Sequence, residues 1–355
     1  MMKKILLLQE QISSYNVSTY NEIAKKYDLT LGYLSKCDTT QSCIFTKKKF
    51  SSKRLGPLLF VPGLRKFCAN FDVVIIMPTL RIVSYCLLPF GRKKYKTSSW
   101  SIGFRVSYEH PYVVDRRHGI ADWVFKLILS ACDSNIFYMN KAREFWKLSN
   151  LRLDNVFEAI NTTDVVKIDL APEKKKDFLF VGTLYKGKGL DLLLQAYKNV
   201  ISKSCSDTKL HIVGSGPELE TLKLFVTENR LYDKVIFHGP IYDELIISEV
   251  FKKALLCFSP TQAGLSVPKS MGYGVPFVTR KDAITGGEIY HITSNVNGLV
   301  YEEDADLINI MDDAISNRDK YIKMGFAAMD YYYNHATVSH MAQGAIDAIE
   351  YALNN

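Results

Sequence analysis

A chain of 355 residues with 47% hydrophobic and 23% charged residues is typical of a globular protein with two domains, because a single core seldom organises so many residues. Its 45 lysines and arginines against 37 aspartates and glutamates give a formal charge of +8, which favours an anionic partner such as nucleotide phosphates, anionic lipid headgroups or nucleic acid. The seven cysteines are odd in number and scattered, and neither Cys-x-x-Cys nor His-x-x-x-His occurs, so we expect reduced thiols, a cytoplasmic location and no metal site.

The apolar segments do not predict a transmembrane helix. Lys3 and Lys4 precede an apolar run that stops after about four residues with no cleavage site, so we interpret it as a first strand rather than a signal peptide. The longest apolar tract, residues 73–90, contains Pro78, Arg81 and Pro89 and fits a strand followed by a helix.

The first half of the chain alternates strands with helices. Hydrophobic periodicity predicts strands over 4–9, 28–34, 72–77, 97–102, 134–139 and 156–160, and helices over 16–26, 80–88, 121–132 and 140–149. The opening strand-helix-strand unit is Rossmann-like, but no Gly-x-Gly-x-x-Gly follows its first strand, so we expect no dinucleotide cofactor there. The polar segment 103–119 follows a strand end, where such folds bind ligands, and is our acceptor-side candidate.

Residues 46–66 interleave lysines and arginines with apolar and aromatic residues. Two interpretations remain open for this segment. It is either a solvated basic face or a surface that presses on anionic lipid headgroups, and the second would suit a lipid-linked substrate.

A proline and a run of charges at 171–177 indicate a linker, after which the alternation restarts. We predict strands over 178–181, 210–213, 235–238, 255–258 and 275–279, helices over 190–202, 218–228 and 242–253, and helical sequence over 320–353. The predicted fold class is therefore α/β, with two Rossmann-like doubly wound domains facing a cleft. We expect an acceptor-side domain over 1–170, a nucleotide-sugar-binding domain over 171–335 and a helix over 336–355 that returns to the first domain.

Residues 258–276 form a strand, a loop and a helix start that carry most of the functional information. Gly264 permits close backbone approach, Ser266 suits an N-cap and Pro268 suits the first helical turn. Backbone N–H groups at such a turn favour an anion such as a diphosphate. The alternative is an ordinary strand-loop-helix corner.

Lys188 lies at another helix start, after Gly182 at a strand end. A lysine is unfavourable near the positive end of a helix dipole, so its presence there points to a phosphate ligand. The alternative is an exposed loop lysine. Two further turns, at 213–217 and 237–240, follow strands of the same half.

Together with 286–289 and 297–299, these segments resemble the second domain of the family 4 glycosyltransferases, the retaining enzymes of GT-B fold that use nucleotide sugars. Segments 14–17, 24–30, 138–143 and 159–164 look like the first domain of a bacterial polysaccharide-type branch of that family. The resemblance implies transfer of a sugar from a UDP- or GDP-sugar to a glycan or lipid-linked glycan in capsule or O-antigen biosynthesis. It implies a cytoplasmic enzyme, peripheral on the plasma membrane, with no cofactor beyond its nucleotide-sugar co-substrate.

The sequence departs from the family pattern at its acidic pair. The two glutamates that contact the donor sugar and the ribose in the family fall here on Thr261 and Lys269, and an arginine usual after the first strand is Thr183. We expect Gln262, Ser266 or Glu288 to take over these contacts.

The resemblance and the motifs assign site residues by role. The catalytic candidates are Lys188, Gly264 and Ser266, which would stabilise charge on the departing diphosphate. The acceptor-side candidates are Ser14, Trp100, Arg105 and His110. The donor-binding candidates are Gly182, Thr183, Lys186, Lys188, Pro240, Ile241, Thr261, Gln262, Gly264, Leu265, Ser266, Lys269 and Glu288.

Three other hypotheses compete with a transferase. A GT-B scaffold that has lost its acidic pair and only binds nucleotide sugars would not hydrolyse the donor. A nucleotide-sugar epimerase should show paired acids in the site, and the motif has none. Nucleic-acid binding is disfavoured because the basic residues are spread over loops without a recognition helix.

Overall fold

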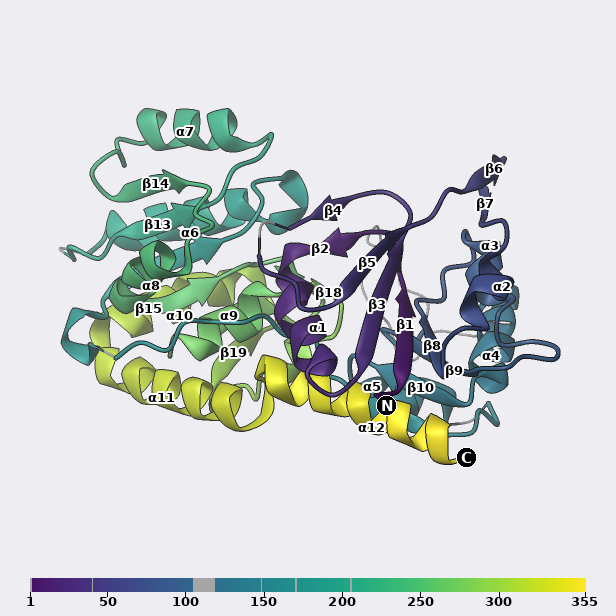
Figure 1. The fold of residues 1–355 in the computed structure, drawn as a ribbon. Coiled ribbons are helices and arrows are strands. Elements are labelled where there is room, and N and C mark those ends of the chain that lie inside the picture. Colours follow the sequence, from purple (N-terminus) through teal and green to yellow (C-terminus); the bar gives the residue numbers. More distant parts are fainter. Residues whose placement is uncertain (1, 40, 105–118, 148, 170, 205) are drawn as a thin grey trace. The chain divides into compact units, whose positions relative to one another are not determined.

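The computed structural model describes residues 2–39, 41–104, 119–147, 149–169, 171–204 and 206–355, which group into two compact units. The described residues up to 104, together with 119–161 and Val338–Asn355, form the first unit. The second unit spans Thr162–Thr337. Within the described residues, the chain passes from the first unit to the second after Asn161 and returns to the first with its last helix (Figure 1).

A seven-stranded parallel sheet forms the centre of the first unit, in the order β11-β10-β9-β8-β1-β3-β5. Its central strands β1 and β8 are nearly continuous apolar runs, as expected for a parallel sheet covered on both faces, whereas β9 and β10 bury polar side chains such as Ser99 and Asn135, which hydrogen-bond to each other. Two short pairs, β2 with β4 and β6 with β7, lie outside this sheet. The strands are β1 Lys4–Leu8, β2 Ile12–Ser13, β3 Asp28–Tyr33, β4 Cys37–Asp38, β5 Thr46–Lys49, β6 Lys53–Leu55, β7 Leu58–Phe60, β8 Val73–Ile76, β9 Lys96–Ser101, β10 Ser134–Phe137 and β11 Val156–Glu158.

Helices cover both faces of this sheet. One face packs against α1 and the C-terminal helix α12, and the other against α2, α3 and α4 (Figure 1). Gly344 lets α12 lie on the end of β11, because a Cβ there would stand 1.9 Å from the carbonyl oxygen of Glu158. The helices are α1 Val17–Ala24, α2 Leu64–Cys68, α3 Val83–Cys86, α4 Ile120–Ala131, α5 Lys141–Trp146 and α12 Val338–Asn354.

The second unit has a six-stranded parallel sheet in the order β14-β13-β12-β15-β17-β19. The chain builds outward from β12 in one direction and from β15 in the other, so the strand order reverses between these two strands. Such a reversal opens a crevice at the carboxyl ends of the strands, where doubly wound folds bind ligands. The strands are β12 Asp177–Val181, β13 Leu210–Val213, β14 Val235–Gly239, β15 Ala254–Phe258, β17 Phe277–Arg280 and β19 Gly298–Tyr301, with the small pair β16 Gln262–Ala263 and β18 Ile284–Thr285.

The helices of the second unit follow its strands in alternation. The apolar faces of α6, α10 and α11 belong to one core cluster of the sheet, and those of α8, α9 and α11 belong to another. The predicted α/β class with two Rossmann-like sheets is confirmed. The helices are α6 Leu190–Ile201, α7 Leu219–Glu228, α8 Glu244–Lys253, α9 Ser266–Gly272, α10 Asp304–Ser316 and α11 Arg318–His335.

Three of the differences from the sequence predictions have a clear physical cause. The helix expected over 80–88 is reduced to α3, because Ile82 has non-helical dihedral angles and Pro89 follows closely. The helical sequence 320–353 divides into α11 and α12 at Ala336, which has φ −129°. The edge strand β5, with its consecutive exposed lysines, was not predicted, since its sequence has no apolar face.

The predicted linker at 171–177 is an ordered part of the second unit. The Arg318 guanidinium donates to the carbonyl oxygens of Pro172, Glu173 and Lys175. The boundary between the two compact units lies between Asn161 and Thr162. The proline and charges that suggest a linker are therefore held by tertiary contacts.

Two further observations concern the environment of the chain. Within the described ranges, no helix combines the length and apolarity that a membrane crossing requires. Burial raises the pKa of the Cys68, Cys132 and Cys257 thiols to about 12, which keeps these buried thiols protonated.

Lys175 provides a test of the second core. Its ammonium is buried and donates to the carbonyl oxygens of Phe251 and Ala254, and burial lowers its pKa to about 7. Between that value and the unfolded pKa of about 10.4, the unfolded chain binds more protons, so stability rises with pH. Relative to Lys175→Met, the wild type should gain on the order of 1 kcal/mol per pH unit between pH 7 and 10, measured by urea unfolding.

The neighbouring Lys176 supplies the control, since it is exposed and pairs with Asp207. Lys176→Met should follow the wild-type pH profile. Identical slopes for the wild type and Lys175→Met would mean that Lys175 keeps its proton in the folded protein.

Candidate functional site

The loops after β12 and β15 meet at the point where the strand order of the second sheet reverses. Gly189, with φ +66°, lies at the start of α6, and a Cβ on it would stand 3.0 Å from both Pro260 and Thr261. The Thr261 hydroxyl donates to the carbonyl oxygen of Gly187 at 2.8 Å. The sequence segments 182–189 and 258–266 therefore form one site.

The turn after β13 packs directly against the loop after β12. A Cβ on Gly214, which has φ +141°, would stand 1.8 Å from the carbonyl oxygen of Gly182, and one on Gly216 would stand 2.2 Å from that of Leu184. Leu184 N–H also donates to the carbonyl oxygen of Ser215. The Gly-Ser-Gly motif thus has a structural role, which is close backbone packing that fixes the course of residues 182–184.

Lys188 and Glu288 are buried charged residues that face the same site. Lys188 is 9% exposed, and its ammonium lies 6.0 Å from the centre of the Tyr185 ring. Burial lowers the pKa of Lys188 to about 8, against the opposing effect of the Glu288 carboxylate. Glu288 itself accepts hydrogen bonds from Gly286 N–H at 2.7 Å and from the Thr285 hydroxyl at 3.1 Å. A buried ammonium of this kind is suited to an anionic ligand.

Gln262 is held at the opening of the site. Its side-chain oxygen accepts a hydrogen bond from the Tyr185 hydroxyl, and its backbone pairs with Ile284 through β16 and β18. Thr183 is exposed beside these residues. Polar side chains on this rim can reach the hydroxyl groups of a ligand.

Gly264 is a glycine that the fold itself does not require. A Cβ there would have nothing within 4 Å, and its φ lies outside the left-handed range. Open space beside a backbone with ordinary dihedral angles is expected where a ligand approaches closely.

The prediction that Ser266 is the N-cap of the following helix is wrong. Leu265 takes the cap position with φ −58° and ψ −13°, and Ser266 is already the first residue of α9. Leu265 adopts helical dihedral angles, so the turn starts one residue earlier than the side-chain preference suggests. Pro268 lies in the first turn as predicted.

Lys269 is not directed to solvent. Its ammonium forms an ion pair with Glu244 of α8 at 2.5 Å, and the hydroxyl of the buried Tyr273 donates to the same carboxylate at 2.7 Å. Glu244 follows the N-cap Asp243, whose carboxylate accepts from two backbone N–H groups. A carboxylate is therefore present next to the position where the family pattern has one, but it comes from another helix.

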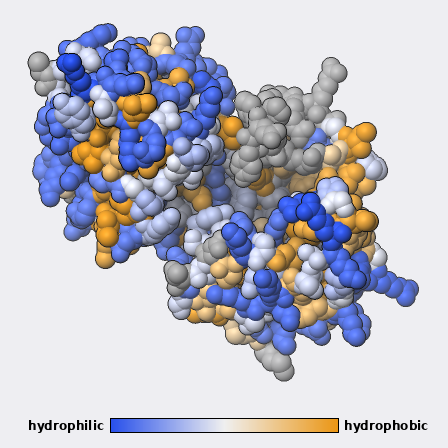
Figure 2. Space-filling view, turned by 90° about the horizontal axis from the view of Figure 1, so that it is seen from above, coloured by the Kyte–Doolittle hydropathy of each residue, from blue (hydrophilic) through white to orange (hydrophobic). Residues whose placement is uncertain are grey.

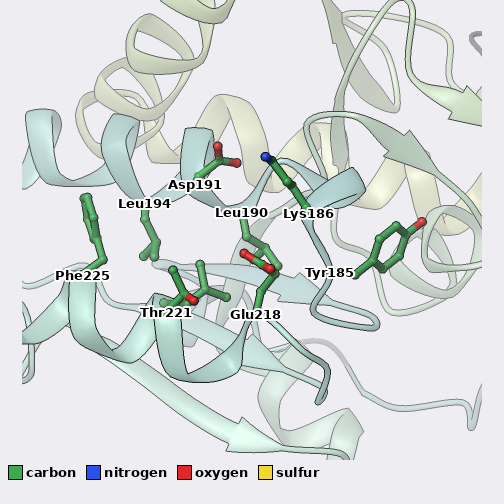
Figure 3. Close-up of a pocket in the computed structure, with 9 residues that line it drawn as sticks. Tyr185, Lys186, Leu190, Asp191, Leu194, Glu218, Thr221 and Phe225 are labelled. Atoms are coloured by element: carbon green, nitrogen blue, oxygen red, sulfur yellow. The ribbon is translucent and has the colours of Figure 1, made fainter. Parts of the chain in front are cut away.

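The remaining donor candidates are Pro240, Ile241 and Lys186. Pro240 and Ile241 follow β14, Pro240 exposed and Ile241 half-buried. Lys186 lines a pocket of about 230 Å³ between α6 and α7, with an apolar floor that includes Leu194 and Phe225 (Figure 3). In Figure 3 Tyr185 lies at the side of this pocket, on the same loop as Lys186.

The acceptor-side candidates belong to the first unit. Ser14 is exposed in a short 3-10 turn after β2. Trp100 is 1% exposed and packs edge-to-face on Tyr20, so its ring is part of the core. Arg105 and His110 lie outside the described residues.

Sequence reasoning missed Glu244 and Tyr185. Glu244 directly follows an Asp that begins a helix after a strand end, which is a detectable signal for a residue at the carboxyl edge of the sheet. The Glu244–Lys269 pair joins two different helices, so neither sequence segment alone contains a pattern that reveals it. Across the described ranges, no group of three or more His, Cys, Asp or Glu residues is arranged to hold a metal ion.

Comparison with known proteins matches residues 162–330 to the family model described as Glycosyl transferases group 1. A curated relative, an uncharacterized glycosyltransferase of Haemophilus influenzae, is 27% identical over 203 residues. That match covers 56% of this chain and 56% of the relative, so the chain spans little more than half of that protein.

Solved structures resemble the chain over almost its whole length. HepE of Anabaena, solved in complex with UDP, has a TM-score of 0.75 at 17% identity and covers 98% of this chain and 99% of its own. The apo lipopolysaccharide outer core galactosyltransferase WaaB has a TM-score of 0.69 at 15% identity, with the same coverage. At this identity the likeness shows the fold, which is GT-B.

The environments of Gly214 and Gly264 predict that substitution by alanine has a large effect on stability at the first position and little effect at the second. Gly214→Ala places a methyl group against the carbonyl oxygen of Gly182 and should lower the free energy of unfolding by more than about 2 kcal/mol. Gly264→Ala should change stability by less than about 0.5 kcal/mol, because its Cβ meets open space. Thermal unfolding of both variants measures this, and comparable losses would contradict the assignment of Gly264 to ligand approach.

Proposed function

We propose that the protein is a retaining glycosyltransferase that moves a sugar from a nucleoside diphosphate sugar to a glycan or a lipid-linked glycan. The observation that carries this proposal is the buried ammonium of Lys188 at the reversal point of a doubly wound sheet, on a loop that contacts the loop of Gly264 through Gly189 and Thr261. The family match of residues 162–330 supports it.

The chemistry requires stabilisation of a leaving group. The bond between the anomeric carbon and the diphosphate oxygen breaks, the bond to the acceptor hydroxyl oxygen forms on the same face, and the hydroxyl proton passes to the departing diphosphate. Lys188 and the backbone N–H groups of 264–266 would stabilise the negative charge that grows on that diphosphate. No cofactor beyond the nucleotide-sugar co-substrate enters this scheme.

The donor and the pathway are part of the same proposal. The UDP complex of HepE supports a UDP-sugar over a GDP-sugar, and the outer core activity of WaaB supports a role in cell-surface polysaccharide synthesis. A cytoplasmic enzyme acting peripherally at the inner face of the plasma membrane fits that role. Thermal stabilisation by a panel of UDP-, GDP- and dTDP-sugars would identify the donor, since a ligand at 100 times its Kd adds about 2.7 kcal/mol.

A second candidate is a GT-B protein that binds nucleotide sugars without transferring them. Thr261 and Lys269 at the positions of the family's acidic pair favour it. Slow hydrolysis of the donor in the absence of acceptor would exclude this candidate.

We also propose that Glu244 binds the ribose in place of the missing carboxylate. Lys269 and Tyr273 hold this carboxylate, which is 35% exposed, at the first turn of α8, directly after the loop that contains Pro240 and Ile241. Lys269 would then be a positioning residue, because it acts through Glu244.

Lys188→Ala should weaken nucleoside diphosphate binding at least tenfold and leave nucleoside binding almost unchanged. A charge-assisted bond to phosphate contributes about 1.5 to 3 kcal/mol, and about 1.4 kcal/mol corresponds to a factor of ten. Turnover should fall further than affinity, because charge on the diphosphate grows as the sugar leaves. Calorimetric titration with UDP and uridine measures the first difference, and equal losses for both ligands would remove Lys188 from the phosphate site.

The pH dependence of binding gives an independent control. A bound diphosphate should raise the pKa of Lys188 from about 8, so wild-type affinity should be constant below pH 8 and fall as the pH rises above it. Lys188→Arg, which stays protonated, should lose this decline. Lys186→Ala, from the exposed neighbour on the same loop, should keep it.

Glu244→Gln should weaken uridine and UDP binding by the same factor, because a ribose contact is shared by both ligands. A lost bond to a charged group predicts about tenfold. Lys269→Met should produce a smaller loss of the same kind, since it frees the carboxylate without removing it. Unchanged uridine affinity in both variants would place Glu244 outside the donor site while leaving the Lys188 result intact.

A further inference from the structure

We propose that α4, together with the basic hairpin and loops around α2 and α3, forms a docking surface for an anionic lipid bilayer. This inference concerns the first unit and does not depend on the proposed transfer reaction. It identifies residues beyond the basic segment 46–66.

The outer face of α4 is apolar where a surface helix is normally charged. Ile120, Trp123 and Leu127, spaced three and four residues apart, are 86%, 59% and 41% exposed. The charged residues of the helix are turned elsewhere: Asp122 is buried and accepts from Gly119 N–H, and Lys126 donates to the carbonyl oxygen of Ser149. A helix that is apolar on all sides normally contacts apolar surroundings on all sides.

Exposed apolar residues continue onto the neighbouring elements. Leu87 and Phe90, just after α3, are 53% and 40% exposed, and Leu55 on the β6–β7 hairpin is 70% exposed. The Leu59–Ile82 bridge joins β7 to the start of α3, and one core cluster contains residues of α2, α3 and α4. Figure 2 shows orange side chains directly beside blue ones at the right-hand edge, the side on which Figure 1 draws these elements.

Basic side chains surround this apolar area. Arg65 donates to the carbonyl oxygens of Leu87 and Phe90, which holds a guanidinium next to two exposed apolar residues. In the sequence stretches 45–104 and 119–131 the acids are Asp72, which pairs with Lys3, and the buried Asp122. Arg81 pairs with Glu10, and the other exposed basic residues of this region include Lys48, Lys53, Arg54, Arg65, Lys66, Arg92 and Lys94.

This combination matches a bilayer better than other partners. An exposed tryptophan with aliphatic neighbours suits the boundary between headgroups and acyl chains, and each nearby lysine or arginine adds about 1 kcal/mol of attraction to an anionic leaflet. A second copy of the same surface would bring like charges together. Nucleic acid would leave the α4 face without an apolar partner.

Trp123 is a built-in reporter for this surface. The protein has three tryptophans, and Trp100 and Trp146 are at most 1% exposed, so a change in tryptophan emission on docking must come from Trp123. The full chain is mixed with phosphatidylcholine vesicles that do or do not contain phosphatidylglycerol. We expect a blue shift with phosphatidylglycerol alone, reversed by added salt because screening weakens the attraction.

Variants test the residues directly. Trp123→Phe should still float with the vesicles but lose the blue shift. Trp123→Ser/Leu127→Ser should lower vesicle affinity about tenfold or more, from the apolar burial lost. The matched control is Leu224→Ser/Phe326→Ser, which removes exposed apolar residues from α7 and α11 and should bind vesicles like the wild type.

Three results would overturn the proposal. The first is no blue shift with phosphatidylglycerol vesicles at low salt. The second is wild-type emission that is already blue without vesicles and insensitive to aqueous quenchers, as expected if another segment of this chain covers Trp123. The third is a dimer that becomes a monomer in Trp123→Ser/Leu127→Ser, as expected if a second copy covers it. None of these results bears on UDP binding, so failure of the docking surface and failure of the proposed transferase function are distinguishable.

Discussion

The candidate site of the second unit centres on the ammonium of Lys188, which is buried and has no directly bonded carboxylate among the described contacts. Removing a charge from water is costly unless polar groups compensate it, and here the Glu288 carboxylate and the Tyr185 ring are the nearby partners of Lys188. The result is a pKa lowered to about 8 and a site whose electrostatics favour an anion. The glycine packing beneath the loop keeps this lysine in place, because Gly214 and Gly216 let two strand-end loops touch backbone to backbone.

The second feature of the site is the ion pair between Glu244 of α8 and Lys269 of α9. Lys269, in the middle of α9, forms an ion pair with Glu244, and Tyr273 donates a second hydrogen bond to that carboxylate. Lys269 thus lies where the family 4 pattern that the sequence resembles has a glutamate, and a carboxylate from α8 lies 2.5 Å from its ammonium. In this view the substitution at Lys269 relocates the acid to another helix, and the local electrostatic balance is kept.

Sequence periodicity predicted the parallel strands well, because residues 178–181 of β12 and all residues of β15 are apolar and almost entirely buried. It could not predict β5, whose exposed lysines become a strand only by pairing with β3. The sequence offered Gly264 and Lys188 as candidates because each lies in one segment that contains the whole pattern. Glu244 was missed because its partner lies 25 residues away on another helix, and Ser266 was assigned to a cap that Leu265 occupies.

A docking surface on the first unit would change how an acceptor is found. If the acceptor carries a lipid, both molecules are confined to the same bilayer, and confinement raises effective concentration without any new contact at the active site. Weak docking suffices for this effect, because the enzyme must leave one acceptor before it reaches the next. The exposed side chains of α4 provide limited apolar area, while the surrounding lysines and arginines act at longer range. In this arrangement, electrostatic attraction would bring the protein to the bilayer, and Trp123 and its neighbours would orient it there.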